Sequence, residues 1–251
     1  MTSKADTKAR FPVLISGSID LQSVCPVIEY RSFETPYGIA EGYLSEECFV
    51  ILRHGKENKT APHRINHQAN IAAAKQLGPF IFALGSVGSL DEEVGPGSIA
   101  IPDDIFAPYL IETISNDAER IHVVPEFDSK LRRHLISDLS FAGIGFTDGG
   151  TYAQTRGPRF ESKSEVLWLS DYAHFVGMTC ASELTIACEL QVPYALLVSV
   201  DNWGNGLGPK SLTMDEYLLG VEANHEMVCS TLGFLLPSLK RLAEAGFGSH
   251  S

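Results

Sequence analysis

Positive charge is scarce in this sequence of 251 residues. Lys and Arg together number 19 against 31 Asp and Glu, which gives a formal net charge of −12 at pH 7. An acidic surface repels nucleic-acid backbones and anionic lipid headgroups, so neither is an expected partner. A small anion pocket stays compatible with this charge, because a few backbone N–H groups and one or two Arg can build one locally.

Cysteine pairs and metal-ligand clusters are also missing. The five Cys residues include no C-x-x-C pair and no His/Cys cluster at the spacing of a zinc site. The sequence therefore predicts no disulfide framework and no bound metal. Scattered, reduced thiols are typical of a cytoplasmic protein.

No apolar run in the sequence is long enough to span a membrane. Residues 1–10 are polar and lack the apolar core of a signal peptide, so we expect a cytoplasmic location and no membrane partner. The apolar fraction of 44% and the charged fraction of 20% are ordinary for a globular protein.

Short apolar runs alternate with segments of helical spacing along the chain. The predicted strands are 11–15, 39–44, 48–52, 80–84, 98–102, 149–154, 175–178 and 194–200. The predicted helices are 66–78, 129–142, 164–172, 182–190 and a long one capped by Thr213. This alternation predicts one α/β domain over residues 11–242, with a mixed central β-sheet flanked by helices and flexible termini at 1–10 and 243–251. Several strands end in small or polar residues, where open α/β sheets bind ligands.

A series of motifs follows the same order as in one known family. Residues 53–55 read Arg-His-Gly and residues 65–70 read Ile-Asn-His-Gln-Ala-Asn. They resemble the R-H-G and V/I-N-Y-x-A-N elements of the purine nucleoside and methylthioadenosine phosphorylases. The later motifs resemble the A-x-G-S/G-L … P-G-D, G-P-x-F/L-E-T and G-M-T/S-x-x-P-E elements of that family, and they lie at 85–98, 157–161 and 177–183. The resemblance covers residues 13–240.

This resemblance implies a distorted mixed β-barrel flanked by helices, assembled as a homotrimer or a dimer of trimers. It implies an enzyme of purine salvage that uses inorganic phosphate to cleave a nucleoside into free base and sugar 1-phosphate, without a cofactor or metal. The phosphate site implied by the resemblance consists of Ser18, Arg53, His54, Ser86 and Thr179. The guanidinium of Arg53 suits this role because it donates two parallel hydrogen bonds to an oxyanion. Ser18 could instead only cap its strand, and His54 could be structural.

Glu161 and Asn202 match the positions that decide the base in this family. A 6-oxopurine carries a hydrogen on N1, which a carboxylate accepts, and its O6 and N7 accept hydrogen bonds from an amide. A 6-aminopurine has an acceptor at N1, so an ionised Glu would leave two acceptors facing each other. The pair therefore predicts hypoxanthine or guanine, oriented by Glu161 and stabilised as a leaving group by Asn202. An alignment shifted by one residue would put Asp201 in place of Asn202.

The other substrate contacts are expected around the sugar. Met178 matches the residue beneath the ribose, and Phe160 belongs to the same motif as the base-reading Glu. Met214 and Tyr217 would form an apolar pocket for a 5′-methylthio group, because no His stands where enzymes for a free 5′-hydroxyl often carry one. A neighbouring subunit closes this pocket in the family. The candidates for that contact are His122 and Phe127.

Several positions depart from the family pattern. Ile19 follows a first loop that is less glycine-rich than usual, and Asn58 stands where many relatives have a phosphate-binding His. Residues 181–182 read Ala-Ser in place of Val-Pro, and the loop at 203–208 is unusual. Three alternatives therefore stay open: a methylthioadenosine phosphorylase, a phosphate-independent nucleoside hydrolase, and a non-catalytic purine-binding protein.

Overall fold

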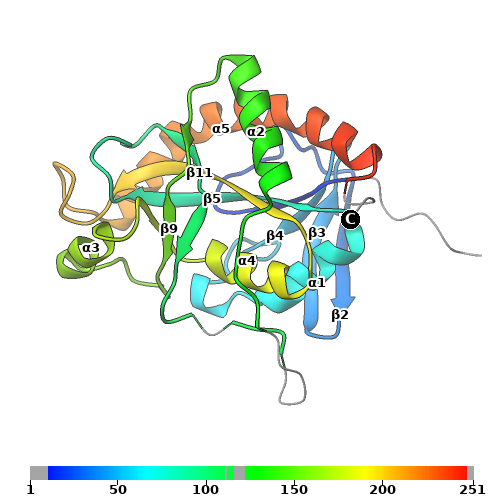
Figure 1. Cartoon of the computed structure of the whole chain (residues 1–251), viewed down its shortest axis with the longest axis horizontal. Coiled ribbons are helices and arrows are strands. Elements are labelled where there is room, and N and C mark those ends of the chain that lie inside the picture. The colour runs from blue at the N-terminus through cyan, green and yellow to red at the C-terminus, as the bar shows by residue number, and fades with distance from the viewer. Residues whose placement is uncertain (1–10, 111, 116–121, 248–251) are drawn as a thin grey trace, which may run out of the picture.

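The computed structural model describes residues 11–110, 112–115 and 122–247. These residues form one domain in which helices flank a central β-sheet (Figure 1). The strands are β1 (Val13–Ser16), β2 (Glu29–Thr35), β3 (Gly38–Leu44), β4 (Phe49–Leu52), β5 (Ile81–Ser89), β6 (Ile99–Ile101), β7 (Asp104–Phe106), β8 (Thr147–Asp148), β9 (Thr151–Gln154), β10 (Phe175–Gly177) and β11 (Tyr194–Trp203). The helices are α1 (His67–Leu77), α2 (Ser129–Ala142), α3 (Lys163–Ser170), α4 (Cys180–Glu189) and α5 (Met214–Glu244), with a short 3-10 helix at Pro62–Arg64.

The sheet branches at β5. This strand pairs in parallel with β1 and with β11, and antiparallel with β10. One path of strands runs β2-β3-β4-β1-β5-β10-β9-β7, while β11 continues to β6 and then β8. Parallel and antiparallel pairs therefore occur in the same sheet, and the predicted mixed sheet flanked by helices is confirmed.

Alternate residues of the central strands face two different helix layers. In β1, Val13 and Ile15 pack in the core shared with α1 and α4, whereas Leu14 packs in the core shared with α2 and α5. The alternation follows from the two-residue period of a strand. Figure 1 shows α2 and α5 on one side of the sheet and α1 and α4 on the other. Because both faces are covered, the central strands appear in the sequence as continuous apolar runs.

Two strands extend further than the sequence predicts. Residues 85–89 were expected to form a loop after a strand at 80–84, but β5 continues to Ser89. Likewise, β11 continues through Asn202 to Trp203, with a register shift between Val200 and Asn202. The glycines in β5 serve close packing: a Cβ at Gly85 would lie 3.2 Å from both Cys180 Sγ and Val198 Cγ1. Small residues here therefore signal neighbouring side chains and not a turn.

Strand β2 was not predicted, because its side chains are mostly exposed and polar. It forms an antiparallel hairpin with β3 across the turn predicted at Tyr37. The short strands β7 and β8 were also missed, β7 within the segment 103–127 that was expected to be irregular. Hydrophobic periodicity indicates a strand only where several apolar residues recur, so exposed or very short strands give no such signal.

The last helix, α5, is capped as predicted, since Thr213 Oγ1 accepts a hydrogen bond from Glu216 N at 3.2 Å. It passes the expected domain end at residue 242, with Ala243 buried in the core. Phe247 then packs on Phe80 with ring centroids 5.0 Å apart. The expected flexible segment 243–251 is therefore wrong for 243–247, while residues 1–10 and 248–251 lie outside the described residues. Among the helices of the described ranges, none has the length and apolarity needed to cross a bilayer.

Candidate active site

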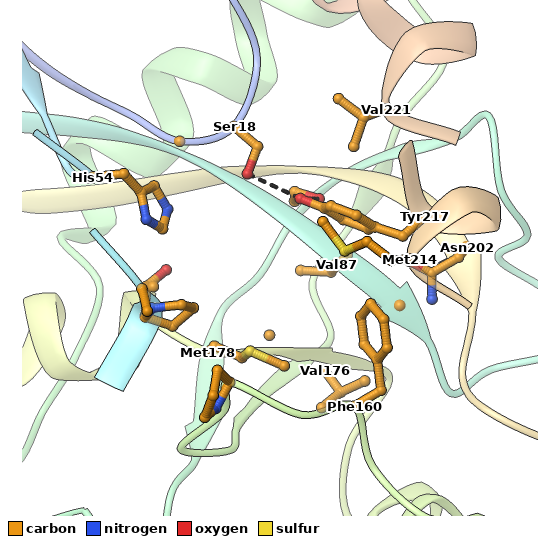
Figure 2. Close-up of a pocket in the computed structure, with 18 of the residues that line it drawn as sticks. Ser18, His54, Val87, Phe160, Val176, Met178, Asn202, Met214, Tyr217 and Val221 are labelled. Carbon is orange, nitrogen blue, oxygen red and sulfur yellow. Dashed lines mark hydrogen bonds between the residues drawn. The ribbon is translucent and has the colours of Figure 1, made fainter. Parts of the chain in front are cut away.

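One pocket brings together residues from distant parts of the sequence (Figure 2). It has a volume of about 440 Å³ and lies at the ends of β1, β4, β5 and β11, which run parallel to one another, while β10 approaches from the opposite direction. The predicted residues that line it are Ser18, Arg53, His54, Ser86, Phe160, Glu161, Met178, Thr179, Asn202, Met214 and Tyr217. Arg53 and Glu161, which the sequence assigns to phosphate and base, thus face the same space.

Arg53 is held rigidly by a buried carboxylate. Its Nε and Nη2 donate to the two oxygens of Glu183 at 2.6 and 2.9 Å, and both side chains are almost fully buried. Burial opposes ionisation of Glu183, but the Arg53 charge and hydrogen bonds outweigh it and lower the pKa of Glu183. Tyr194 adds a hydrogen bond from its hydroxyl to Glu183 Oε2 at 2.8 Å. The sequence motif contained Glu183, but its role as the partner of Arg53 was not predicted.

The remaining nitrogen of Arg53, Nη1, does not bond to Glu183 and lies beside Gly17, which also lines the pocket. Nη1 donates to the carbonyl of Leu84 at 2.8 Å, which uses one of its two hydrogens. A Cβ at Gly17 would lie only 2.8 Å from this nitrogen, so the glycine after β1 is required for the guanidinium to sit here. Gly17 and Arg53 both line the pocket, and Nη1 is the part of Arg53 with a hydrogen left for an anion.

The surroundings of His54 favour its neutral form. Its Nδ1 lies 2.7 Å from the carbonyl oxygen of Thr60, which can only accept, so Nδ1 carries the hydrogen. Burial lowers the pKa of His54, and the neighbouring Arg53 charge lowers it further. Nε2 of the neutral ring is therefore an acceptor, and Figure 2 shows the ring pointing into the pocket.

A chain of hydroxyl groups runs along one wall of the pocket. Tyr217 donates from its hydroxyl to Ser18 Oγ at 2.9 Å and lies 3.4 Å from Ser86 Oγ. Ser86 in turn donates to the carboxylate of Asp201, which also accepts from Asn224 Nδ2 at 2.7 Å. Burial raises the pKa of Asp201, although these hydrogen bonds oppose the shift. Asn202 lines the pocket, whereas Asp201 is buried and is not part of the lining. Of the two residues that the sequence alignment left open, Asn202 is therefore the one that faces the pocket.

The two residues predicted to read the base, Glu161 and Asn202, also line the pocket. Glu161 is only 6% exposed, and its Oε1 accepts a hydrogen bond from Thr155 Oγ1 at 2.5 Å. Asn202 donates from Nδ2 to the carbonyl of Trp203 at 2.8 Å, which fixes the plane of the amide. The second hydrogen and the carbonyl oxygen of this amide have no protein partner among the bonds of the described residues.

The N-terminus of α4 is capped from within the protein. The backbone N–H groups of Thr179 and Cys180 both donate to the hydroxyl oxygen of Tyr152, each at 3.2 Å. Helix N-termini commonly bind anions through such groups. The backbone N–H of Thr179 is therefore occupied, while its hydroxyl lies 3.5 Å from Cys180 Sγ and Thr179 lines the pocket. The phosphate-binding role of this hydroxyl stays a prediction.

Helix α5 contributes an apolar wall to the pocket, including Met214, Leu218 and Val221. Tyr217 shares this wall through its ring, but its hydroxyl bonds to Ser18, which an apolar pocket residue would not do. Phe127 is buried in the core of its own chain, with its ring centroid 6.1 Å from that of Tyr194. Its suggested reach into a neighbouring pocket is therefore wrong.

His122 lies apart from the pocket. Its side chain is exposed, and it is absent from the pocket lining. A contact from this residue to a neighbouring subunit stays a prediction, because the pocket lining within one chain does not test it.

A family model described as the phosphorylase superfamily matches residues 20–232. A protein of Archaeoglobus fulgidus named "Probable 6-oxopurine nucleoside phosphorylase" is 39% identical over 218 residues, which cover 84% of this chain and 89% of the relative. A protein of Methanocaldococcus jannaschii named "Probable S-methyl-5′-thioinosine phosphorylase" is 36% identical over 211 residues, covering 81% and 83%.

A solved methylthioadenosine phosphorylase from an Antarctic soil metagenomic library superimposes with a TM-score of 0.79. The superposition covers 96% of this chain and 92% of the solved chain. Because the two sequences are only 24% identical, the likeness shows a shared fold alone. The match of the family model, the identity to the two relatives and the shared fold agree with the motifs in the sequence. This chain belongs to the phosphorylase superfamily.

Proposed function

We propose that this chain catalyses phosphorolysis of a 6-oxopurine nucleoside, giving the free base and a sugar 1-phosphate. The observation that carries the proposal is that Arg53 and Glu161 line one pocket together with Asn202. The names of the two relatives, a 6-oxopurine nucleoside phosphorylase and a methylthioinosine phosphorylase, support the same base. The reaction needs no cofactor or metal beyond inorganic phosphate as the second substrate.

Base choice in this proposal follows from hydrogen-bond direction. A carboxylate oxygen of Glu161 accepts the hydrogen on N1 of hypoxanthine or guanine, while Thr155 holds Oε1 in place. The amide of Asn202 keeps one hydrogen for N7 or O6 after its bond to Trp203. An adenine base has a lone pair at N1 and would face the Glu161 carboxylate unfavourably.

Phosphate is proposed to bind at the opposite end. Arg53 Nη1 and the hydroxyls of Ser18 and Thr179 supply donors, and Ser86 lines the same region. The acceptor Nε2 of neutral His54 fits a phosphate oxygen that still carries a proton. Because Glu183 neutralises most of the Arg53 charge, the donors act mainly by direction and less by net charge.

The chemical step joins the two ends. A phosphate oxygen forms a bond to C1′ as the C1′–N9 bond breaks, and the bonding electrons leave with the purine. The sugar passes through an oxocarbenium-like state, which the phosphate beneath it stabilises electrostatically. Asn202 donates to the negative charge that develops on the base, and a preorganised donor of this kind contributes about 3–4 kcal/mol.

The substituent at C5′ and the assembly complete the proposal. Met214, Leu218 and Val221 present carbon atoms where the 5′ group would lie, which favours a methylthio group over a hydroxyl. We further propose a homotrimer, or a dimer of trimers, in which His122 of a neighbouring subunit closes this end of the pocket.

A panel of nucleosides assayed with and without inorganic phosphate tests the proposal. We expect turnover of methylthioinosine and inosine that requires phosphate, with little turnover of methylthioadenosine. Turnover that ignores phosphate would identify a hydrolase, and preferred turnover of methylthioadenosine would overturn the assignment of the base. Binding of purines without product release would identify a non-catalytic protein.

A further inference from the structure

Tyr217 takes part in the phosphate end of the pocket, beyond the apolar role expected from the sequence. Its hydroxyl lies between Ser18 Oγ, at 2.9 Å, and Ser86 Oγ, at 3.4 Å. Both serines belong to the proposed phosphate site. Figure 2 shows the Tyr217 ring reaching into the pocket from α5, with its hydroxyl meeting Ser18.

The direction of these hydrogen bonds follows from the number of hydrogens. A Ser or Tyr hydroxyl has one hydrogen to donate. Ser86 gives its hydrogen to the carboxylate of Asp201, because a bond to a charged acceptor is stronger than one to a neutral acceptor. Tyr217 then gives its hydrogen to Ser18, the nearer of the two serines. The hydrogen of Ser18 is left free to donate to a ligand.

Asp201 is built to hold the far end of this chain. It is 3% exposed and accepts hydrogen bonds from Ser199 Oγ at 2.5 Å and from Asn224 Nδ2 at 2.7 Å. Asn224 lies on α5, as Tyr217 does, so the carboxylate connects the same helix to β5 and β11. The position of the Ser86 hydroxyl, and through it one side of the phenol, is therefore fixed.

The ring of Tyr217 extends to the base end. Its centroid lies 6.0 Å from that of Phe160, at an interplanar angle of 55°. Aromatic pairs attract each other at this separation. A nucleoside that packs against these rings restrains the phenol, and the phenol in turn orients Ser18.

We propose that Tyr217 is a positioning residue that aims the Ser18 hydroxyl at phosphate, and that its ring links phosphate binding to nucleoside binding. The inference rests on the proposed function for its ligand, inorganic phosphate. It adds a residue of α5 to a phosphate site that the sequence motifs place on β5, after β1 and β4, and at the N-cap of α4.

The first test is Tyr217→Phe, which keeps the ring and removes the hydroxyl. We expect the KM for phosphate to rise about 5- to 10-fold, as for the loss of one neutral hydrogen bond, while the KM for nucleoside changes less than about twofold. Tyr172→Phe is the matched control, because Tyr172 is exposed and stacks on Phe106 outside the pocket. An unchanged KM for phosphate in Tyr217→Phe overturns the proposal.

A double-mutant cycle separates positioning from a general structural effect. If Tyr217 acts through Ser18, adding Tyr217→Phe to Ser18→Ala raises the KM for phosphate no further. Fully additive effects contradict this route. Tyr217→Leu also removes the ring, so we expect it to raise the KM for nucleoside as well as that for phosphate. A nucleoside KM unaffected by this variant overturns the proposed link between the two ends.

Calorimetric titration with inorganic phosphate alone distinguishes this inference from the proposed function. If the wild-type chain binds phosphate but turns over no nucleoside, the proposed function fails, and a weaker Kd in Tyr217→Phe still supports the inference. If wild-type turnover requires phosphate while Kd and KM are unchanged in Tyr217→Phe, only the inference fails. A wild-type chain that neither binds phosphate nor uses it overturns both.

Discussion

The type of a residue in this pocket does not by itself tell how many of its hydrogens are free to bind a ligand. Arg53 was expected to grip phosphate with a parallel pair of donors, yet two of its nitrogens are occupied by Glu183. The hydroxyl hydrogen of Ser86 is likewise occupied, because it is donated to Asp201. At the residue scale, the donors left for a ligand are decided by the buried carboxylates behind the pocket.

Replacing the carboxylate behind Arg53 tests this view through stability. Glu183→Gln leaves the guanidinium buried without its counter-charge, so we expect the free energy of unfolding to fall by about 3–5 kcal/mol near neutral pH. Because the pKa of Glu183 is lowered in the folded protein, its contribution is present above the ordinary value of 4.5 and is lost as pH falls through the lowered value. Urea unfolding of both proteins should show a gap that narrows below pH 4.5. A gap independent of pH contradicts the ionised pair.

Replacing Glu161, the carboxylate proposed to read the base, tests specificity. Glu161→Ala removes the acceptor for the purine N1 hydrogen, so we expect kcat/KM for 6-oxopurine nucleosides to fall about 10- to 100-fold. The Kd for phosphate alone should stay within about twofold, because Glu161 is not among the residues proposed to hold phosphate. Glu92→Ala, at an exposed position outside the pocket, is the control. Retention of full activity in Glu161→Ala would refute the base assignment.

At the scale of whole elements, β5 and β11 build the site because both strands continue beyond their predicted ends, to Ser89 and Trp203. β5 and β11 pair along nearly their full lengths, which sets Asn202 beside Gly88. A Cβ at Gly88 would lie 2.9 Å from Asn202 Nδ2. The glycine in β5 therefore leaves room for the amide on β11.

This packing predicts a selective defect in Gly88→Ala. The added methyl group must displace the Asn202 amide, so we expect the KM for nucleoside to rise about 10-fold, in the range of one lost hydrogen bond. The KM for phosphate should be unaffected. Gly145→Ala is the matched control, because a Cβ there meets nothing within 4 Å. Equal losses for both substrates in Gly88→Ala would indicate a disturbed sheet instead.

For the whole molecule, the pocket is open on the side of α5. Met214 and Leu218 line it, yet they are 56% and 51% exposed. Apolar side chains exposed beside a ligand site are commonly covered by substrate or by another subunit. This arrangement is compatible with the proposed trimer, in which a neighbour completes the pocket.

The assembly has a direct measurement. We expect light scattering after gel filtration to give three times the chain mass of 27.3 kDa, or a multiple of that trimer. His122→Ala should keep this mass but raise the KM for a nucleoside with a 5′-methylthio group. A monomer at assay concentration, with full activity, would contradict both the trimer and the role of His122.

Much of this molecule follows from local sequence. Helix α2 has the predicted bounds of 129–142, Thr213 caps α5 as predicted, and the apolar runs form the buried strands. These features depend on neighbours within a few residues, such as caps and periodic apolar side chains, so a linear pattern carries them. The sequence motifs likewise identified the family and most of the predicted residues that line the pocket.

The tertiary structure alone decided which of those residues keep free donors. Arg53 meets Glu183 across 130 positions of sequence, and Ser86 meets Asp201 across 115. Tyr217 meets Ser18 because α5 packs against β11 and so brings this residue to the loop that follows β1, a placement that no local pattern encodes. The physical reason is that a hydrogen bond requires two groups within about 3 Å, and for distant residues only the complete path of the chain brings them that close.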